Sequence, residues 1–276
     1  MKKIVFIMSC LVLTITHGQN LSVMTYNLRL DVASDGDNAW SIRKDFLVSQ
    51  IQFYEPDIMG VQEALPNQMD NLKSGLSAYK AIGIGRDGNN KGEYSAIFYN
   101  AKKLKVENEN TFWLSKTPER VSKGWDAAYP RICTYGLFTD LKSSKSFWVF
   151  NTHLDHVGKQ AQLNGIKLIQ QKIVEVNTKK YPVVLMGDFN VEPNSLLIKK
   201  LSEDMLNTET VSKSTFGPNG TFNGFKFNEP VTRKIDYIFM SKSHNLEVNK
   251  QAVLSASINL KYPSDHFPVY AEFTLE

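Results

Sequence analysis

The chain has 276 residues, 42% of them hydrophobic and 22% charged, with a formal net charge of +4. This length and composition are enough for one large folded domain with a substantial core. Lys2 and Lys3 carry two of the positive charges, so residues 19–276 have a net charge of +2, which excludes a protein that coats nucleic acid along its length.

The first eighteen residues predict a signal peptide. Lys2 and Lys3 form a basic start, residues 4–15 form an apolar core, and residues 16–18 offer a cleavage site before Gln19. The apolar run is shorter than the roughly 18 residues needed to span a bilayer. We therefore expect export to a secreted or periplasmic location, no stable membrane insertion, and a mature domain over residues 19–276.

Several short apolar runs predict strands that end in polar side chains. In residues 21–28 apolar and polar side chains alternate with period two, as in a strand with one buried face. Residues 183–186 are all apolar and suit a strand buried on both faces. Three runs end in side chains that can bind metal ions or protons, namely Asn27, Glu63 and Asp188. Burying an ionised carboxylate is costly unless it is paired or bound to metal, so we expect these strands to end at a polar pocket.

Helices are predicted between the strands. Ser41 is a candidate N-cap for a helix that stops near Pro56, residues 163–176 carry the clearest helical stripe, and residues 195–206 predict another helix. Residues 214–229 predict a loop rich in Gly, Asn and Phe. The mixed order of helices and short strands, without repeat or linker, predicts one α/β domain of two sheets packed face to face with outer helices.

The polar candidates also have simpler structural explanations. Asn27 can be a turn residue, Glu63 an exposed acid at a strand end, and His153 a core histidine with satisfied hydrogen bonds. Asp236 is less easily explained, because it lies inside an apolar strand, where an ionised carboxylate needs a partner. His266, before the last strand, offers an imidazole whose orientation and charge such an acid would stabilise.

Six short motifs, taken together and in order, resemble those of the endonuclease/exonuclease/phosphatase superfamily. The motifs are Thr25-Tyr26-Asn27, Val61-Gln62-Glu63, Asn151-Thr152-His153-Leu154, Gly187-Asp188-Phe189-Asn190, Ile235-Asp236-Tyr237 and Ser264-Asp265-His266. The superfamily includes deoxyribonucleases, abasic-site endonucleases, inositol-polyphosphate 5-phosphatases, bacterial sphingomyelinases and nocturnin-like deadenylases, the last being nearest in motif. The resemblance spans residues 22–273 and implies a four-layer α/β/β/α sandwich with the site at one rim of the paired sheets.

The resemblance also implies a role for each of nine residues. They are the catalytic residues His153, Asp188, Asp236 and His266, the metal ligands Asn27, Glu63 and Asp265, and the substrate-binding residues Arg131 and Asn190. Whether Asp188 or His266 takes the proton of the attacking water stays open. Mg²⁺ prefers such oxygen ligands, so we expect Mg²⁺ with Mn²⁺ as a substitute, and a zinc site is not expected from this set.

We therefore expect a secreted Mg²⁺-dependent phosphoesterase that acts as a monomer. Nuclease action on short single strands is slightly favoured, because loop aromatics could stack on bases. These aromatics are Trp113, Trp125, Phe222, Phe225 and Phe227. Packing within the loops is the simpler explanation for each of them. Phosphorylated sugars, inositols and phospholipid headgroups remain open as substrates, and a catalytically inactive binding module on the same fold is the rival from another class.

Overall fold

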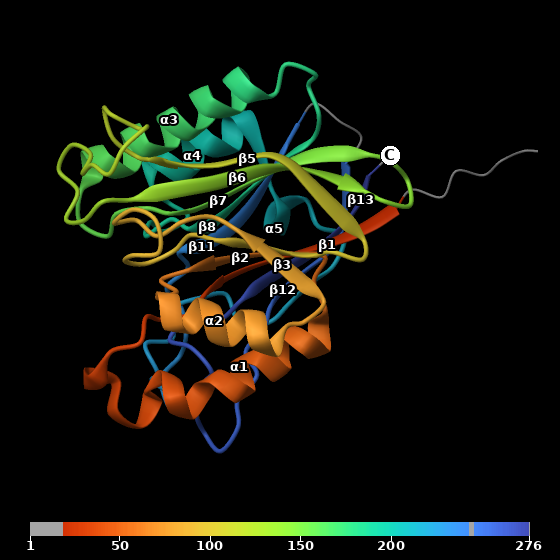
Figure 1. Cartoon of the computed structure of the whole chain (residues 1–276). Coiled ribbons are helices and arrows are strands. Elements are labelled where there is room, and N and C mark those ends of the chain that lie inside the picture. The colour runs from red at the N-terminus through yellow and green to blue at the C-terminus, as the bar shows by residue number, and fades with distance from the viewer. Residues whose placement is uncertain (1–18, 243–245, 276) are drawn as a thin grey trace, which may run out of the picture.

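The computed structural model describes residues 19–242 and 246–275, so the signal peptide predicted for residues 1–18 lies outside the described residues. Two β-sheets pack face to face, and helices cover the outer face of each (Figure 1). The predicted four-layer α/β/β/α sandwich of two mixed sheets is therefore confirmed.

The first sheet contains the strands that begin and end the described chain. Its order is β10-β12-β13-β1-β2-β4-β3, with β1 parallel to β2 and the other neighbouring pairs antiparallel apart from β10 and β12. In that order the strands are Thr215–Phe216, Leu246–Val253, Val269–Leu275, Gln19–Asn27, Ile58–Gln62, Ile97–Asn100 and Tyr79–Ile82.

The second sheet carries the strand that ends at Asp188. Its order is β5-β6-β7-β8-β11-β9, and only β7 and β8 run parallel. In that order the strands are Leu104–Trp113, Ile132–Asp140, Ser146–His153, Val183–Asp188, Asp236–Ser241 and Met205–Asn207.

Two pairs of helices form the outer layers (Figure 1). The first pair, α1 (Trp40–Tyr54) and α2 (Pro66–Gly75), packs on the first sheet, and the second pair, α3 (Lys159–Val176) and α4 (Leu196–Asp204), packs on the second. The short elements are the 3₁₀ helix η1 (Ala33–Asn38) and α5 (Thr208–Val211).

Two helix starts differ in how well the sequence predicts them. The helix predicted for residues 195–206 is α4, which begins one residue later because Ser195 is its N-cap, with Oγ accepting a hydrogen bond from the Ile198 N–H at 3.3 Å. Ser41 is not an N-cap, because α1 already begins at Trp40 and its N-cap, Ala39, has no side-chain hydrogen bond to offer. The start of α1 is thus set by packing of buried Trp40 rather than by a capping side chain.

The central strand β8 is buried on both faces, as its apolar run predicts. Val184 and Met186 point between the sheets, whereas Val183 and Leu185 pack in the layer beneath α3 and α4. This alternation is the period of two that a strand imposes on its side chains. A strand covered on both faces cannot leave an acid unsatisfied in its interior, so the carboxylate comes only at its end.

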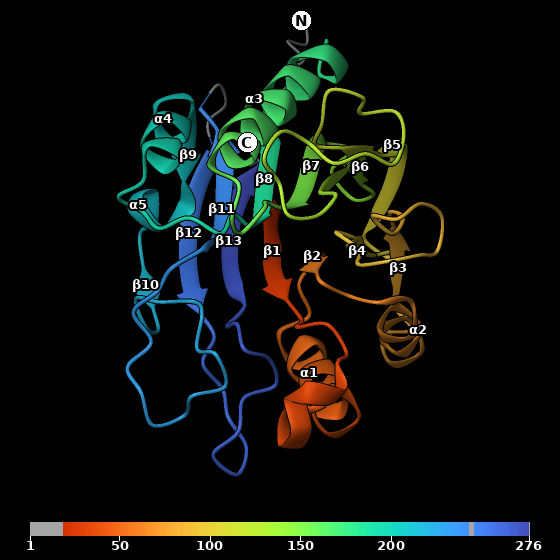
Figure 2. The same cartoon turned by 90° about the vertical axis from the view of Figure 1, so that its left-hand side faces the viewer.

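The registers of the strands bring their polar ends together. Asn27 on β1 is level with Gln62 on β2, and Asp188 on β8 is level with both His153 on β7 and Asp236 on β11. Figure 2 views the molecule from the side on which β1 ends. The ligand-type side chains of both sheets are therefore gathered at one rim.

A buried amide pair joins the two sheets just behind this rim. Gln62 Nε2 donates to Asn151 Oδ1 at 2.7 Å, and Asn151 Nδ2 donates to the carbonyls of Val61 and Ala96. Gly60 leaves the space for this contact, since a Cβ there would collide with the Asn151 side chain. The pair fixes the first sheet against the second where the site lies.

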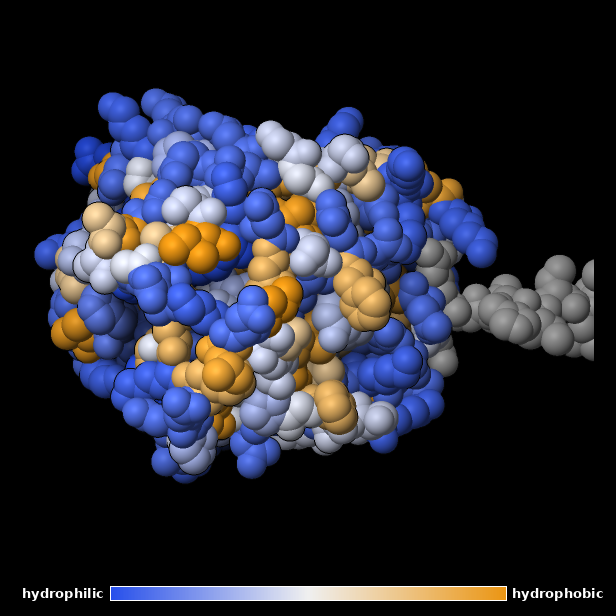
Figure 3. Space-filling model, turned by 90° about the horizontal axis from the view of Figure 1, so that it is seen from below, coloured by the Kyte–Doolittle hydropathy of each residue, from blue (hydrophilic) through white to orange (hydrophobic). Residues whose placement is uncertain are grey.

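Among the described residues, no helix is long and apolar enough to cross a membrane. The face formed over α1 and α2 is largely hydrophilic, with hydrophobic residues in separate spots (Figure 3). Phe53 on α1 and Phe216 on β10 are the most exposed of the large hydrophobic residues in the described part of the chain, at 81% each.

Candidate active site

Asp188 lies at the centre of the polar rim and is buried. Its Oδ2 accepts a hydrogen bond from Asn27 Nδ2 at 2.9 Å and lies 3.5 Å from His153 Nε2 and 3.8 Å from His266 Nε2. Burial, and next the charge of Asp236, raise the pKa of Asp188 to about 7. Its place at the strand end depends on Gly187, where a Cβ would collide with the carbonyl oxygen of Thr152.

His266 and Asp236 form a buried carboxylate–imidazole pair, the dyad that the sequence predicts. His266 Nδ1 lies 2.9 Å from Asp236 Oδ2. Burial disfavours the imidazolium, but the charges of Asp236, Asp188 and Asp265 outweigh it and raise the pKa of His266 to about 10. This raised pKa favours the charged form of His266, whose Nε2 faces Asp188 Oδ2 at 3.8 Å.

His153 has the opposite electrostatic environment. Burial, together with the charge of Arg131, lowers the pKa of His153 well below its ordinary value, so the ring is neutral. Its Nε2 lies 3.0 Å from Asn190 Nδ2, which also donates to the carbonyl of Leu154 at 3.0 Å. One charged and one neutral imidazole thus flank the Asp188 carboxylate.

Glu63 reaches the site from the first sheet, directly after β2. Its Oε1 accepts from Asn27 Nδ2 at 3.0 Å and its Oε2 accepts from the Leu30 N–H at 3.1 Å. Glu63 and Asn190 both have left-handed backbone, with φ of 63° and 52°. Such conformations are costly for residues other than glycine and cluster where a side chain must be aimed at a site.

Asp265 comes from the loop before β13 and is 8% exposed. Its pKa is raised by burial and by the charge of Glu63, against the opposing charge of His266. The Arg29 guanidinium is only loosely paired with it, with Nε 3.9 Å from Asp265 Oδ2. A carboxylate in this position has room to accept a cation.

The donor set fits a divalent cation. One ligand atom each from Glu63, His153 and Asp188 lie within 4.8 Å of one another, and the same holds for Asp188, Asp236 and His266. Asp236 Oδ1 is buried without a hydrogen-bond partner in the described part of the chain. Carboxylates crowded at this density need positive charge near them.

Asn27 is placed differently from a simple oxygen ligand. Its amide nitrogen lies between the Glu63 and Asp188 carboxylates, and its Oδ1 accepts from the Arg29 N–H at 3.0 Å. In this arrangement it holds the two acids in place. Its role as a metal ligand stays a prediction.

The site opens into a pocket of about 510 Å³. All of the nine predicted residues line it except Asn27 and Asp236, which lie beneath it. Arg131, at its edge, is oriented by Asp155, whose Oδ2 lies 3.3 Å from Arg131 Nε, and by His156 at 3.2 Å. The structure therefore gathers all nine residues, from both sheets, at one place.

The pocket also has walls that the sequence reasoning missed. These residues are Arg29, Arg86, Glu93, Tyr129 and Arg233. Most of them lie in loops, where neither a hydrophobic period nor a strand end marks a residue, so the sequence carries no local signal for their position.

Most aromatics predicted for base stacking are used in packing. Trp113 is buried and its Nε1 donates to the Arg86 carbonyl, and Phe227 packs on Tyr262. Phe225 lies against Arg43. Of the five candidates only Phe222 lines the pocket.

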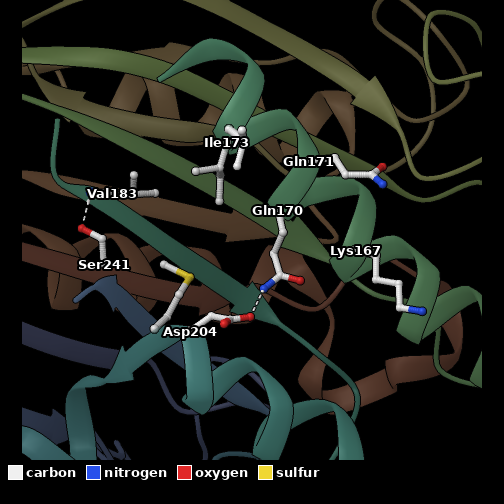
Figure 4. A pocket seen from close by; sticks show the side chains of 9 residues that line it. Lys167, Gln170, Gln171, Ile173, Val183, Asp204 and Ser241 are labelled. Atoms are coloured by element: carbon white, nitrogen blue, oxygen red, sulfur yellow. Dashed lines mark hydrogen bonds between the residues drawn. The ribbon is translucent and has the colours of Figure 1, made fainter. Parts of the chain in front are cut away.

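A larger hollow of about 690 Å³ lies elsewhere, between α3 and the end of α4 (Figure 4). Gln170 on α3 donates to Asp204 on α4 at 3.0 Å across it, and Ser241 accepts from the Val183 N–H. Its wall has one acid and no histidine. It lacks the paired titratable groups of the rim, so we place the chemistry at the smaller pocket.

Comparison with known proteins identifies the family and the fold. The profile of the Endonuclease/Exonuclease/phosphatase family matches residues 24–266. A protein of that family from Bacteroides thetaiotaomicron is 36% identical with a TM-score of 0.90, and the match covers 94% of this chain and 99% of that chain. A mannosyl-6-phosphatase from the same organism is 37% identical with a TM-score of 0.88, covering 92% and 100%.

The human Nocturnin catalytic domain is a more distant match. It is 23% identical with a TM-score of 0.72, covering 93% of this chain and 94% of that domain, which shows a shared fold. The chain spans 65% of the length of whole human Nocturnin. With the family profile matching most of its length, the chain belongs to the endonuclease/exonuclease/phosphatase family and is a metal-dependent hydrolase of phosphate ester bonds.

Proposed function

We propose that this phosphoesterase removes the phosphate group from a small phosphorylated sugar, with Mg²⁺ as its cation. The observation that carries the proposal is the 37% identity to a mannosyl-6-phosphatase over 92% of this chain and the whole of that one. A pocket of about 510 Å³ is of the size that takes one small ligand. This choice replaces the nuclease as the favoured function, because most aromatics expected to stack on bases are used in packing.

The geometry suggests a division of labour for the hydrolysis. Asp188 accepts the proton of the attacking water, because the raised pKa of His266 favours an imidazolium whose two nitrogens both already carry a proton. His153 and Asn190 hold the phosphate oxygens on the other side of Asp188. Glu63 and Asp265, with their neighbours, would hold the cation, which would supply positive charge against the phosphate and favour ionisation of water.

A nuclease acting on short single strands is the second candidate. Phe222 favours it, because this half-buried ring lines the pocket, lies edge-on to His266, and offers a surface on which a base could stack. Against it, residues 19–276 carry little net positive charge, and affinity for a long polyanion depends on many cationic contacts.

A parallel substrate panel tests the proposal. The purified protein with Mg²⁺ is given mannose 6-phosphate, inositol phosphates, a labelled oligonucleotide and sphingomyelin vesicles. Release of phosphate, strand cleavage and release of phosphocholine are followed, respectively, for the phosphomonoesters, the oligonucleotide and the vesicles. We expect the highest kcat/KM with the hexose phosphate. Cleavage of the oligonucleotide, with mannose 6-phosphate untouched, would instead support the nuclease.

We further propose that the chain is exported, is cleaved before Gln19, and works as one catalytic domain and a monomer. The basic start and apolar core of residues 1–18 support the export. N-terminal sequencing of protein purified from its native host, and its mass in solution, test these points. A mature protein that begins at Met1 would contradict the export.

A further inference from the structure

One wall of the pocket is built from a paired acid and base on the loop between β3 and β4. Arg86 and Glu93 face each other across this loop, since the Arg86 N–H donates to the Glu93 carbonyl at 2.9 Å. Their side chains also pair, with Arg86 Nη2 2.8 Å from Glu93 Oε1. The side chains are only 15% and 13% exposed, so the pair is held in place within the pocket lining.

Aromatic residues from two other segments extend this wall. The Arg86 guanidinium lies 4.8 Å from the centre of the Tyr129 ring, and Tyr129 stacks on His156 with an interplanar angle of 17°. Trp113 Nε1 donates to the Arg86 carbonyl at 2.7 Å and ties the loop to the end of β5. We call Arg86, Glu93, Tyr129 and His156 the lateral wall. All four line the same pocket as Asp188.

The position of the lateral wall suits the leaving group rather than the phosphate. The phosphate end of the pocket is occupied by His153, Asn190 and Arg131, and Arg131 links the two regions through its contact with His156. A second phosphate would meet the Glu93 carboxylate here, and like charges repel. The lateral wall therefore disfavours an anionic leaving group.

Its chemistry matches that of adjacent hydroxyl groups. The carboxylate of Glu93 accepts hydrogen bonds and the guanidinium of Arg86 donates them, side by side at 2.8 Å. Neighbouring hydroxyls of a sugar each donate and accept, so they can bind both members of such a pair. Tyr129, which is 49% exposed, adds a phenol hydroxyl and an apolar ring.

We propose that the lateral wall binds the hydroxyl groups of a sugar leaving group and makes the enzyme selective for polyol phosphates. This inference rests on the proposed function, because it names the part of the site that recognises the sugar. Arg86, Glu93 and Tyr129 are specificity residues in this scheme, and the bond-breaking chemistry stays with Asp188 and its neighbours.

The test compares two substrates that share the phosphate and differ in the leaving group. The kcat/KM for mannose 6-phosphate is divided by that for p-nitrophenyl phosphate, which has no hydroxyl groups on its ring. We expect this ratio to fall about 10- to 100-fold in Glu93→Gln, the effect of losing a hydrogen bond to a charged group. Tyr129→Phe, which removes one exposed hydroxyl and keeps the ring, should lower the ratio by a smaller factor.

Glu119→Gln is the matched control, because Glu119 is an exposed carboxylate on the same loop as Tyr129. It should keep the wild-type ratio. An unchanged ratio in both Glu93→Gln and Tyr129→Phe, in a wild type that hydrolyses mannose 6-phosphate, would overturn the inference and leave the proposed function standing. A wild type that hydrolyses p-nitrophenyl phosphate but not mannose 6-phosphate would overturn both.

Discussion

Replacing Asp155 by Asn should destabilise the protein in a way that depends on pH. Asp155 follows β7 and its carboxylate ties the loop before β6 to the start of α3. It accepts hydrogen bonds from Ala128 N, Tyr129 N and Arg131 Nε at Oδ2, and from Val157 N and Gly158 N at Oδ1, at 2.8–3.4 Å. The substitution keeps only one acceptor oxygen, so one set of donors faces an amide N–H₂.

The magnitude follows from the pKa of the carboxyl. Burial alone would raise the pKa of Asp155, but the N–H groups of Gly158, Ala128 and Val157 and the charge of Arg131 outweigh it and hold the pKa at about 2. Against an ordinary value of about 3.9, and with some solvent screening, this corresponds to about 1–2 kcal/mol of stability. A lowered carboxyl pKa stabilises the fold above pH ~4, and the contribution is lost as the pH falls through about 2.

Urea unfolding at pH 6 and at pH 2.5, followed by tryptophan fluorescence, measures this effect. We expect Asp155→Asn to lower the free energy of unfolding by about 2–3 kcal/mol at pH 6. The difference from wild type should narrow by about 1 kcal/mol at pH 2.5. The exposed Asp45, changed to Asn, is the control and should have little effect at either pH. A difference that is the same at both pH values would refute the assignment of the lowered pKa to these hydrogen bonds.

Three further predictions concern the metal and the residues around it. Excess EDTA should abolish phosphate release and added Mg²⁺ or Mn²⁺ should restore it, and full activity of the stripped protein would contradict a metal-dependent reaction. Asp188→Asn and His266→Ala should each lower kcat by roughly 10²–10⁴-fold with unchanged far-UV circular dichroism, whereas a near-normal kcat would remove the residue from its assigned role. Arg43→Met should lower the free energy of unfolding by at least about 3 kcal/mol and raise the Mg²⁺ concentration for half activity, unlike Lys44→Met on the same helix. The reason is that the buried Arg43 guanidinium donates to the carbonyls of Leu28, Arg29, Asn38 and Pro263, of which the first two follow Asn27 and the last lies two residues before Asp265. Equal effects of the two variants would count against this prediction.

The parts of the site that the sequence predicts are acids that stand out against apolar runs. Asp188 ends such a run, and Asp236 was expected inside a strand but is the first residue of β11, so both acids lie at strand ends. The sequence pattern does not show the order of strands in a sheet. The resemblance to the family implies the sandwich and the position of the site at one rim. That is why residues from five strand ends could be assigned to one place before any distance was known.

The lateral wall could not be found in this way. Arg86 and Glu93 are ordinary charged residues of a loop rich in Gly and Asn, and their pairing depends on a backbone hydrogen bond across that loop. Helix α2 is not predicted from the sequence either. Only Gln68, Met69 and Leu72 of its ten residues are buried, so its apolar stripe is too weak to indicate a helix. Trp113 was wrongly considered for base stacking because the sequence does not show that its side chain turns inward at the end of β5.

The division of the site between two sheets has a consequence for how the enzyme acquires activity as it folds. Asn27 and Asp188, which are joined by a hydrogen bond, are separated by 161 positions along the chain. Contacts between such distant positions form slowly, because the chain loses the entropy of a long loop before the contacts begin to stabilise it. The predicted metal ligands Asn27, Glu63 and Asp265 come from the first sheet and its loops, whereas His153 and Asp188 belong to the second, so we expect refolding protein to stay inactive while its secondary structure forms. Activity should return only with the slowest step, in which the two sheets dock and Gln62 meets Asn151.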